Sequence, residues 1–226
     1  MNERTWGYSG QVGCWDGAFP VPALERSPPL KAVKFLLSLF VPVLSPMHRP
    51  RSMRLSWAEY DHAGGRVATH EHVETSVSSW AAVQAEVDRL GQRTDRRVAV
   101  TTIFIDLDTL VFESSGESWP ENAGKFQVSV DRASVSRPDE IAPDSIGIVY
   151  CTNIDVWVPT TYGPGGPRSN PDAAKNLPRL EAFLRDVAAL VGGGLSADES
   201  RYYGDALTDT GFRDLAGEGE VTADRK

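Results

Sequence analysis

Cysteine is scarce in this chain, which has only Cys14 and Cys151 among its 226 residues. Their spacing matches neither a metal-ligand pattern nor a disulfide framework, and we therefore expect two reduced thiols in a cytoplasmic protein. The chain also lacks any hydrophobic run long enough to span a bilayer. This absence excludes a transmembrane helix, and we expect no membrane partner.

Positive charge is in short supply as well. Lysine and arginine number 23 against 31 aspartates and glutamates, which gives a net charge of −8. The summed field of such a chain repels a phosphate backbone, so we expect no nucleic-acid partner. The rest of the composition is ordinary for a globular protein, with 41% hydrophobic and 24% charged residues.

The first 52 residues differ from the rest in composition. They are net positive, whereas the remainder is strongly net negative. Their prolines are Pro20, Pro22, Pro28, Pro29, Pro42, Pro46 and Pro50. Because prolines so spaced disfavour a long helix or a central strand, we predict that residues 1–52 form a leader that is disordered or not native to the mature protein. Met53 is then a candidate start.

An apolar run within this leader allows two other interpretations. Residues 35–41 are apolar apart from one serine, and Lys31 and Lys34 precede them. A basic flank and an apolar centre are features of a secretory signal, and an amphipathic segment of this kind can also lie at a membrane surface. The segment that follows lacks the small-x-small cleavage pattern, which favours the leader interpretation.

Residues 53–195 carry the periodicity of a folded domain. Alternating or β-branched apolar residues predict strands, at 54–60, 66–74, 98–105, 110–113, 125–130, 146–151 and 155–158. A tight turn is expected at 106–109, and the Gly/Pro-rich stretch 159–171 is expected to be a mobile connection.

Two amphipathic helices complete this domain. One is predicted over 80–90, with Ser78 or Ser79 as its N-cap, and the other over 172–191, with Gly192 at its end. The order hairpin, helix, meander, helix predicts an α+β fold with a largely antiparallel sheet covered on one face. Residues 196–226 form an acidic, partly disordered tail in which only 202–207 is expected to pack.

Two histidines and a glutamate alternate along the predicted strand at 66–74. Side chains at i and i+2 share one face of a strand, so His70, His72 and Glu74 are candidate ligands for zinc or iron, with His62 as a fourth. The alternative is that they form the solvated face of an outer strand. We favour that alternative and expect no resident metal and no cofactor.

The segment VAVTTIFIDLDTLVFES is similar to the nucleophile motif of the haloacid-dehalogenase superfamily of phosphotransferases. The resemblance implies that Asp106 is a nucleophile, that Asp108 is a general acid/base, and that Asp205 helps to bind magnesium. Thr152 and Lys175 match the family's other motifs in order. A magnesium-dependent phosphatase is therefore one candidate function.

The layout from Leu55 to Leu195 resembles a family of immunity proteins from bacterial polymorphic-toxin systems. The matching segments are the AEYDHAGG hairpin, the SSWAAVQAEVDRL helix, the meander ending in IVYCTNIDVWVP, and the helix LPRLEAFLRDVAAL followed by GGGL. The resemblance implies a protein partner, a toxin domain whose active site is covered. Toxins that act on nucleic acids present basic clefts, and an acidic inhibitor associates quickly with such a cleft.

Candidate partner-binding residues lie on two polar loops. They are Glu117, Trp119 and Glu121 on the first loop, and Asp139, Glu140 and Asp144 on the second. Trp119 is the best candidate for a hot spot, because tryptophan is enriched among the residues that dominate binding. The leading hypothesis is a non-enzymatic binding module of immunity type, and the alternative is the phosphatase that uses Asp106 and Asp108.

Overall fold

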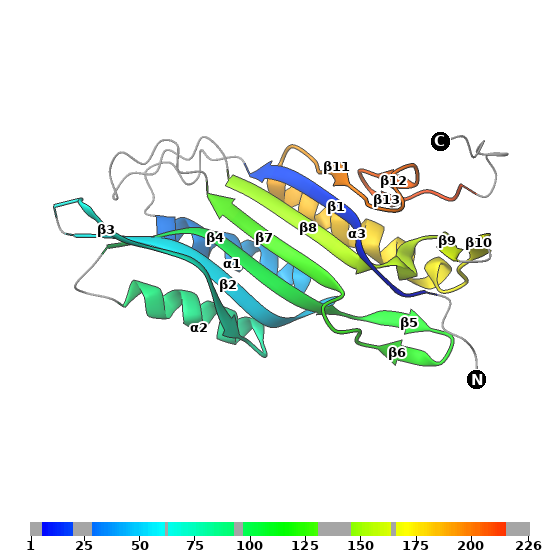
Figure 1. Cartoon of the computed structure of the whole chain (residues 1–226), viewed down its shortest axis with the longest axis horizontal. Coiled ribbons are helices and arrows are strands. Elements are labelled where there is room, and N and C mark those ends of the chain that lie inside the picture. The colour runs from blue at the N-terminus through cyan, green and yellow to red at the C-terminus, as the bar shows by residue number, and fades with distance from the viewer. Residues whose placement is uncertain are drawn as a thin grey trace.

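The computed structural model describes residues 6–19, 29–61, 63–92, 97–130, 146–163 and 166–215. Seven antiparallel strands of this part of the chain form one sheet (Figure 1). They are β1 (Tyr8–Phe19), β2 (His48–Tyr60), β3 (Arg66–Ser76), β4 (Arg97–Thr109), β7 (Gly124–Val130), β8 (Ile146–Ile154) and β11 (Ser196–Glu199). Their order across the sheet is β11-β1-β8-β7-β4-β2-β3.

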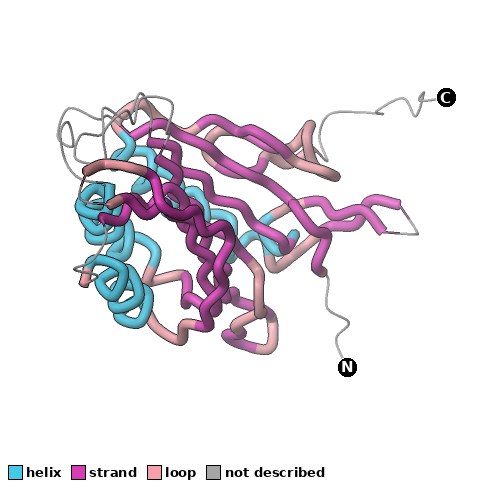
Figure 2. Tube along the Cα trace, turned by 60° about the vertical axis from the view of Figure 1, so that its left-hand side comes forward, coloured by secondary structure: helices cyan, strands magenta, loops and turns pink. Residues whose placement is uncertain are grey.

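Three helices lie on one side of this sheet (Figure 2). They are α1 (Pro29–Leu44), α2 (Trp80–Gly91) and α3 (Ala173–Val191). The predicted α+β class with an antiparallel sheet is therefore confirmed. The N-cap of α2 is also confirmed, because the Ser79 hydroxyl accepts a hydrogen bond from the backbone N–H of Ala82. None of the helices in the described ranges combines the length and the apolar character needed to cross a membrane.

Short elements fill the connections. They are the hairpins β5 (Val111–Glu113) with β6 (Gly116–Ser118), β9 (Thr160–Gly163) with β10 (Gly166–Ser169), and β12 (Leu207–Thr208) with β13 (Gly211–Phe212), and the 3₁₀ turn η2 (Asp155–Trp157). The strand predicted at 155–158 is thus a 3₁₀ turn, and the connection predicted at 159–171 contains a hairpin.

The tight turn predicted at 106–109 is wrong, because β4 continues through these residues. Ile105, Leu107 and Thr109 are buried, whereas Asp106 and Asp108 are only partly buried and lie on the opposite face. Aspartate has a low intrinsic preference for strands, but here its carboxylates stand on the half-solvated side while their neighbours enter the core. Period-two burial outweighs the turn preference of the Asp-x-Asp sequence.

The predicted leader, residues 1–52, is part of the fold wherever it is described. β1 pairs with β8 on one side and β11 on the other, and Trp15 is fully buried. α1 packs Phe40 against Phe19 and Phe126, with ring centroids 6.4 and 5.3 Å apart. Met53 is an interior residue of β2. The boundary at Met53 and the disordered-leader interpretation are therefore wrong for these residues, and the apolar run at 35–41 belongs to a helix with a buried face.

These prolines do not indicate disorder, because they occupy positions that helices and strands tolerate. Pro29 is the first residue of α1, where the missing N–H costs no helical hydrogen bond. Pro42 lies near the end of the same helix, and Pro50 lies beside a register shift in β2. None of these three interrupts a central stretch of regular backbone, so the fold accommodates them.

The predicted boundary at residue 195 is also wrong. β11 extends the sheet beyond β1, and the hairpin β12–β13 buries Phe212 against the core. The expected packing of residues 202–207 is confirmed by the burial of Tyr203 and Ala206. One folded unit therefore runs from Trp6 to Leu215 through the described ranges.

His48 at the start of β2 is a completely buried titratable group. Its Nδ1 lies 3.0 Å from the Thr109 hydroxyl, and its ring contacts the rings of Tyr150 and Phe183. Burial lowers the pKa of His48 to about 3, and the positive charge of Arg179 adds to the effect. The imidazole is therefore neutral at physiological pH.

We expect Phe40→Ala to lower the free energy of unfolding by about 3–5 kcal/mol, because the substitution leaves a cavity between α1 and the sheet. Phe35 is on the same helix but 39% exposed, so Phe35→Ala should cost less than about 1 kcal/mol. Urea denaturation of both variants measures the difference. Equal effects would contradict the packing of α1 described above.

We also expect stability to fall as the pH drops from about 6.5 towards 3. In this interval the unfolded chain protonates His48 and the folded chain does not, so the free energy of unfolding declines by up to about 1.4 kcal/mol per pH unit. His48→Gln should remove this slope, whereas His72→Gln should keep it. Denaturant titrations between pH 7 and 5 test the prediction, and an unchanged slope in His48→Gln would refute it.

Candidate functional site

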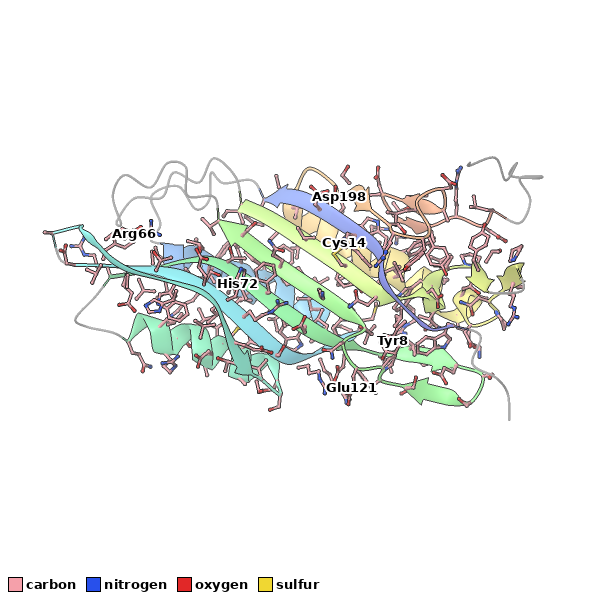
Figure 3. All side chains as sticks on the ribbon, in the orientation of Figure 1. Tyr8, Cys14, Arg66, His72, Glu121 and Asp198 are labelled. Carbon is pink, nitrogen blue, oxygen red and sulfur yellow. A yellow bond between two sulfur atoms is a disulfide. The ribbon has the colours of Figure 1, made fainter. Side chains whose placement is uncertain are left out.

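The face of the sheet opposite the three helices, here called the open face, carries polar side chains. No described helix covers it (Figure 3). Its central residues are Ser52 and Arg54 of β2, Phe104, Asp106 and Asp108 of β4, and Lys125 and Gln127 of β7. These positions are half-buried or exposed, whereas their neighbours along β4 and β7, and Met53 and Leu55 of β2, are buried. The open face is thus a broad surface available for recognition.

Asp106 and Asp108 are held on this face by protein contacts. The Ser52 hydroxyl donates to Asp106 at 2.7 Å, and Arg54 lies 3.5 Å from the same carboxylate. The backbone N–H of Asn122 donates to Asp108 at 3.0 Å, and Arg51 lies 3.8 Å away. Both carboxylates therefore link β4 to β2, and Asp108 also links β4 to the segment before β7.

Asp205 lies far from these two aspartates. It follows β11, and β1, β8 and β7 separate β11 from β4 in the sheet. There it lines a cavity of about 380 Å³ together with Tyr162, Tyr203 and Arg213. The described residues thus do not bring together the carboxylates that the phosphatase hypothesis requires, and the antiparallel sheet differs from the parallel sheet of that superfamily.

The other two residues matched to that superfamily are engaged in structural contacts. Thr152 is fully buried, donates to the Ala123 carbonyl, and accepts a hydrogen bond from the Trp157 indole at 2.9 Å. Lys175 donates to the Glu113 carbonyl at 3.2 Å. Neither lies in a shared site with Asp106.

The predicted metal ligands of β3 do not share a face. Leu55 pairs with Val73 but Trp57 pairs with His70, so β3 has one extra residue, and His72 adopts the left-handed backbone conformation with φ 51°. This bulge breaks the period-two alternation on which the prediction depended.

The two imidazoles consequently make separate contacts. His70 stacks on Trp57 with ring centroids 4.5 Å apart, and its Nε2 lies 3.1 Å from the Glu59 carboxylate. His72 lies on the open face, with its ring 5.5 Å from that of Phe104 (Figure 3). Among the described residues, no three His, Cys, Asp or Glu side chains are grouped so that they could hold a metal ion. The fourth candidate, His62, lies outside the described residues.

Two of the three predicted binding residues of the first loop, Trp119 and Glu121, contact β2 at one end of the open face. Arg49 of β2 places its guanidinium carbon 3.7 Å from the centre of the Trp119 ring. Arg51 forms an ion pair with Glu121 at 2.8 Å, and this hydrogen bond raises the pKa of the arginine. Glu117 is exposed on β6.

Tyr8 of β1 completes this group by donating its hydroxyl to the Glu121 carbonyl at 2.9 Å. Figure 3 shows Tyr8 and Glu121 at the same end of the sheet. We call Tyr8, Arg49, Arg51, Trp119 and Glu121 the Trp119 cluster. The second predicted loop, with Asp139, Glu140 and Asp144, lies outside the described residues.

Cys14 and Cys151 form a disulfide between β1 and β8, so the expectation of reduced thiols is wrong. The two residues are direct partners in the strand register, with Cα atoms 4.1 Å apart, and so their side chains meet on one face. The cytoplasmic setting was inferred from those thiols, whereas disulfides persist in oxidising compartments.

A cavity of about 470 Å³ opens on the sheet beside this disulfide. Its lining residues come from the loops and strands around β1, β7 and β8, and they are Tyr8, Gly10, Gln11, Asn122, Lys125, Cys151, Asn153 and Arg201. The cavity shares Tyr8 with the Trp119 cluster, and Asn122 adjoins Glu121 in sequence. One end of the open face therefore combines an aromatic–arginine cluster with a hollow.

The sequence does not reveal three of the five residues of the Trp119 cluster. Tyr8, Arg49 and Arg51 lie in the predicted leader, and no local pattern distinguishes them. For Arg49 and Arg51 the available signal is the alternation of buried and exposed residues at 48–51, upstream of Met53.

Comparisons with known proteins add no neighbour. No family model matches the chain, and neither a curated protein nor a solved structure matches it.

We expect a double-mutant cycle to detect the contact between Arg49 and Trp119. A cation over an indole ring contributes about 0.5–1 kcal/mol at a partly exposed site, so Arg49→Ala and Trp119→Ala should be coupled by that amount. Arg66 lies at the far end of β3 (Figure 3). Its replacement by alanine should show coupling to Trp119→Ala below about 0.3 kcal/mol. Equal couplings in urea denaturation would exclude the stacking.

Proposed function

We propose that this protein is a non-enzymatic binding module that inhibits a protein partner by covering its active site, as the immunity proteins that its sequence resembles do. The observation that carries the proposal is the Trp119 cluster, in which an aromatic ring and two arginines are fixed at the edge of an uncovered sheet face. Tryptophan, tyrosine and arginine are the residue types that dominate binding energies at protein interfaces.

Preorganisation of the cluster supports this role. Arg49 and Trp119 restrain each other, and Glu121 is held both by Arg51 and through its carbonyl by Tyr8. Association must otherwise order long side chains, at about 0.5–1.5 kcal/mol for each one immobilised. A surface whose side chains are already ordered avoids part of that cost.

Charge indicates the kind of partner. The chain carries a net charge of −8, while Arg49 and Arg51 outnumber Glu121 within the cluster itself. The summed negative field of the whole chain attracts a basic cleft and accelerates encounter with it. A toxin domain with a basic active site fits this requirement.

The disulfide indicates the kind of compartment in which the protein would meet its partner. Because such bonds form and persist in oxidising surroundings, we propose that the encounter takes place in an oxidising compartment, in place of the cytoplasm expected from the sequence.

The test is capture of a partner by the full chain, followed by calorimetry with the purified pair. Trp119→Ala should weaken binding by about 2 kcal/mol, or roughly 30-fold in Kd, while leaving the fold intact. Tyr162→Ala is the matched control, because Tyr162 is 56% exposed and lies on β9, outside the cluster. Equal affinities of the two variants would refute the proposed site, and the absence of any stoichiometric partner would refute the function.

A further inference from the structure

The cavity beside the disulfide is lined by Lys125, Arg201 and Cys151. The proposed binding function requires none of these side chains. We propose that the cavity docks a small anionic thiol, which exchanges with the disulfide at Cys151 and forms a reversible mixed disulfide there. The volume of about 470 Å³ falls within the range of small-molecule sites. This inference is independent of the partner-binding proposal.

The lining of the cavity is positively charged in an otherwise acidic protein. Among the described residues that line it, Lys125 and Arg201 are the charged ones, and none carries a carboxylate. Asp106 of β4 is the register partner of Lys125 of β7, but its carboxylate contacts Ser52 and Arg54 of β2, the strand on the opposite side of β4. The two cations are therefore available to the carboxylates of a ligand.

The two sulfur atoms differ in access and in stabilisation. Cys151 lines the cavity and is half-buried, whereas Cys14 is 1% exposed. The side-chain amide of Gln11 donates to the Cys14 sulfur at 2.9 Å. An incoming thiolate consequently meets Cys151, and the hydrogen bond from Gln11 stabilises the thiolate that Cys14 becomes on leaving.

The exchange step balances without an external oxidant or reductant. The thiolate of the ligand attacks the Cys151 sulfur, a new sulfur–sulfur bond forms, and the bond to Cys14 breaks with its electron pair remaining on Cys14. The ligand thiol is oxidised to the mixed disulfide while Cys14 is reduced, and Cys14 later takes a proton from water. Attack by Cys14 on the mixed disulfide reverses the step.

β1 does not depend on the disulfide for its place in the sheet. It is hydrogen-bonded to β8 and to β11, and Trp15 is fully buried with its ring stacked on Tyr150 at 6.1 Å. The exchange therefore modifies a folded protein.

The experiment compares three thiols of different charge acting on the full chain. Glutathione is anionic, 2-mercaptoethanol is neutral and cysteamine is cationic. Each rate is divided by the rate of the same thiol with a small soluble disulfide, which removes differences in intrinsic reactivity. Samples are quenched in acid and mapped by mass spectrometry. We expect a normalised preference for glutathione over cysteamine of about tenfold, lower at high salt, with the adduct on Cys151.

Two variants separate docking from leaving-group stabilisation. Lys125→Gln combined with Arg201→Gln should abolish the preference for glutathione, while Lys175→Gln, a lysine outside the cavity, should preserve it. Gln11→Leu should slow all three thiols alike. An equal normalised rate for the three thiols, an adduct on Cys14, or a preference that survives loss of both cations would overturn the proposal.

Discussion

The one-sided burial of a seven-stranded sheet determines most of this structure. Along β4, Ile103, Ile105 and Leu107 enter the core under the helices, and the residues between them stand on the open face. The three described helices therefore all lie on the same side of the sheet. The polar surface, the Trp119 cluster and the cavity all occupy the side that the helices leave free.

Local irregularities redirect individual side chains within this scheme. The bulge in β3 separates His70 from His72, and a second register shift in β2 falls beside Pro50. Because a one-residue shift exchanges the two faces of a strand, these positions determine what the open face displays. The contacts of Asp106 with Arg54 and of Asp108 with Arg51 then hold these two arginines in place.

Local pattern predicted the elements whose signals are contiguous in sequence. The helix α2 was recovered with its Ser79 cap, and the core strands β4, β7 and β8 were recovered within a few residues. What could not be predicted depends on pairing between distant segments. The disulfide joins residues 137 apart, and the Trp119 cluster combines β1, β2 and the segment after β6. The prolines of the first 52 residues masked β1 and α1, because composition does not reveal that a proline occupies a tolerated position.

The place of β1 in the sheet also constrains how the chain acquires its fold. Its partners, β8 and β11, come much later in the sequence than β1, so β1 is synthesised well before the strands that flank it. The long stretch of chain between β1 and these partner strands makes their pairing a step of high contact order. Until it occurs, one edge of β8 lacks its partner strand and Cys14 has no Cys151 within reach. The disulfide can therefore form only when β1 has paired with β8.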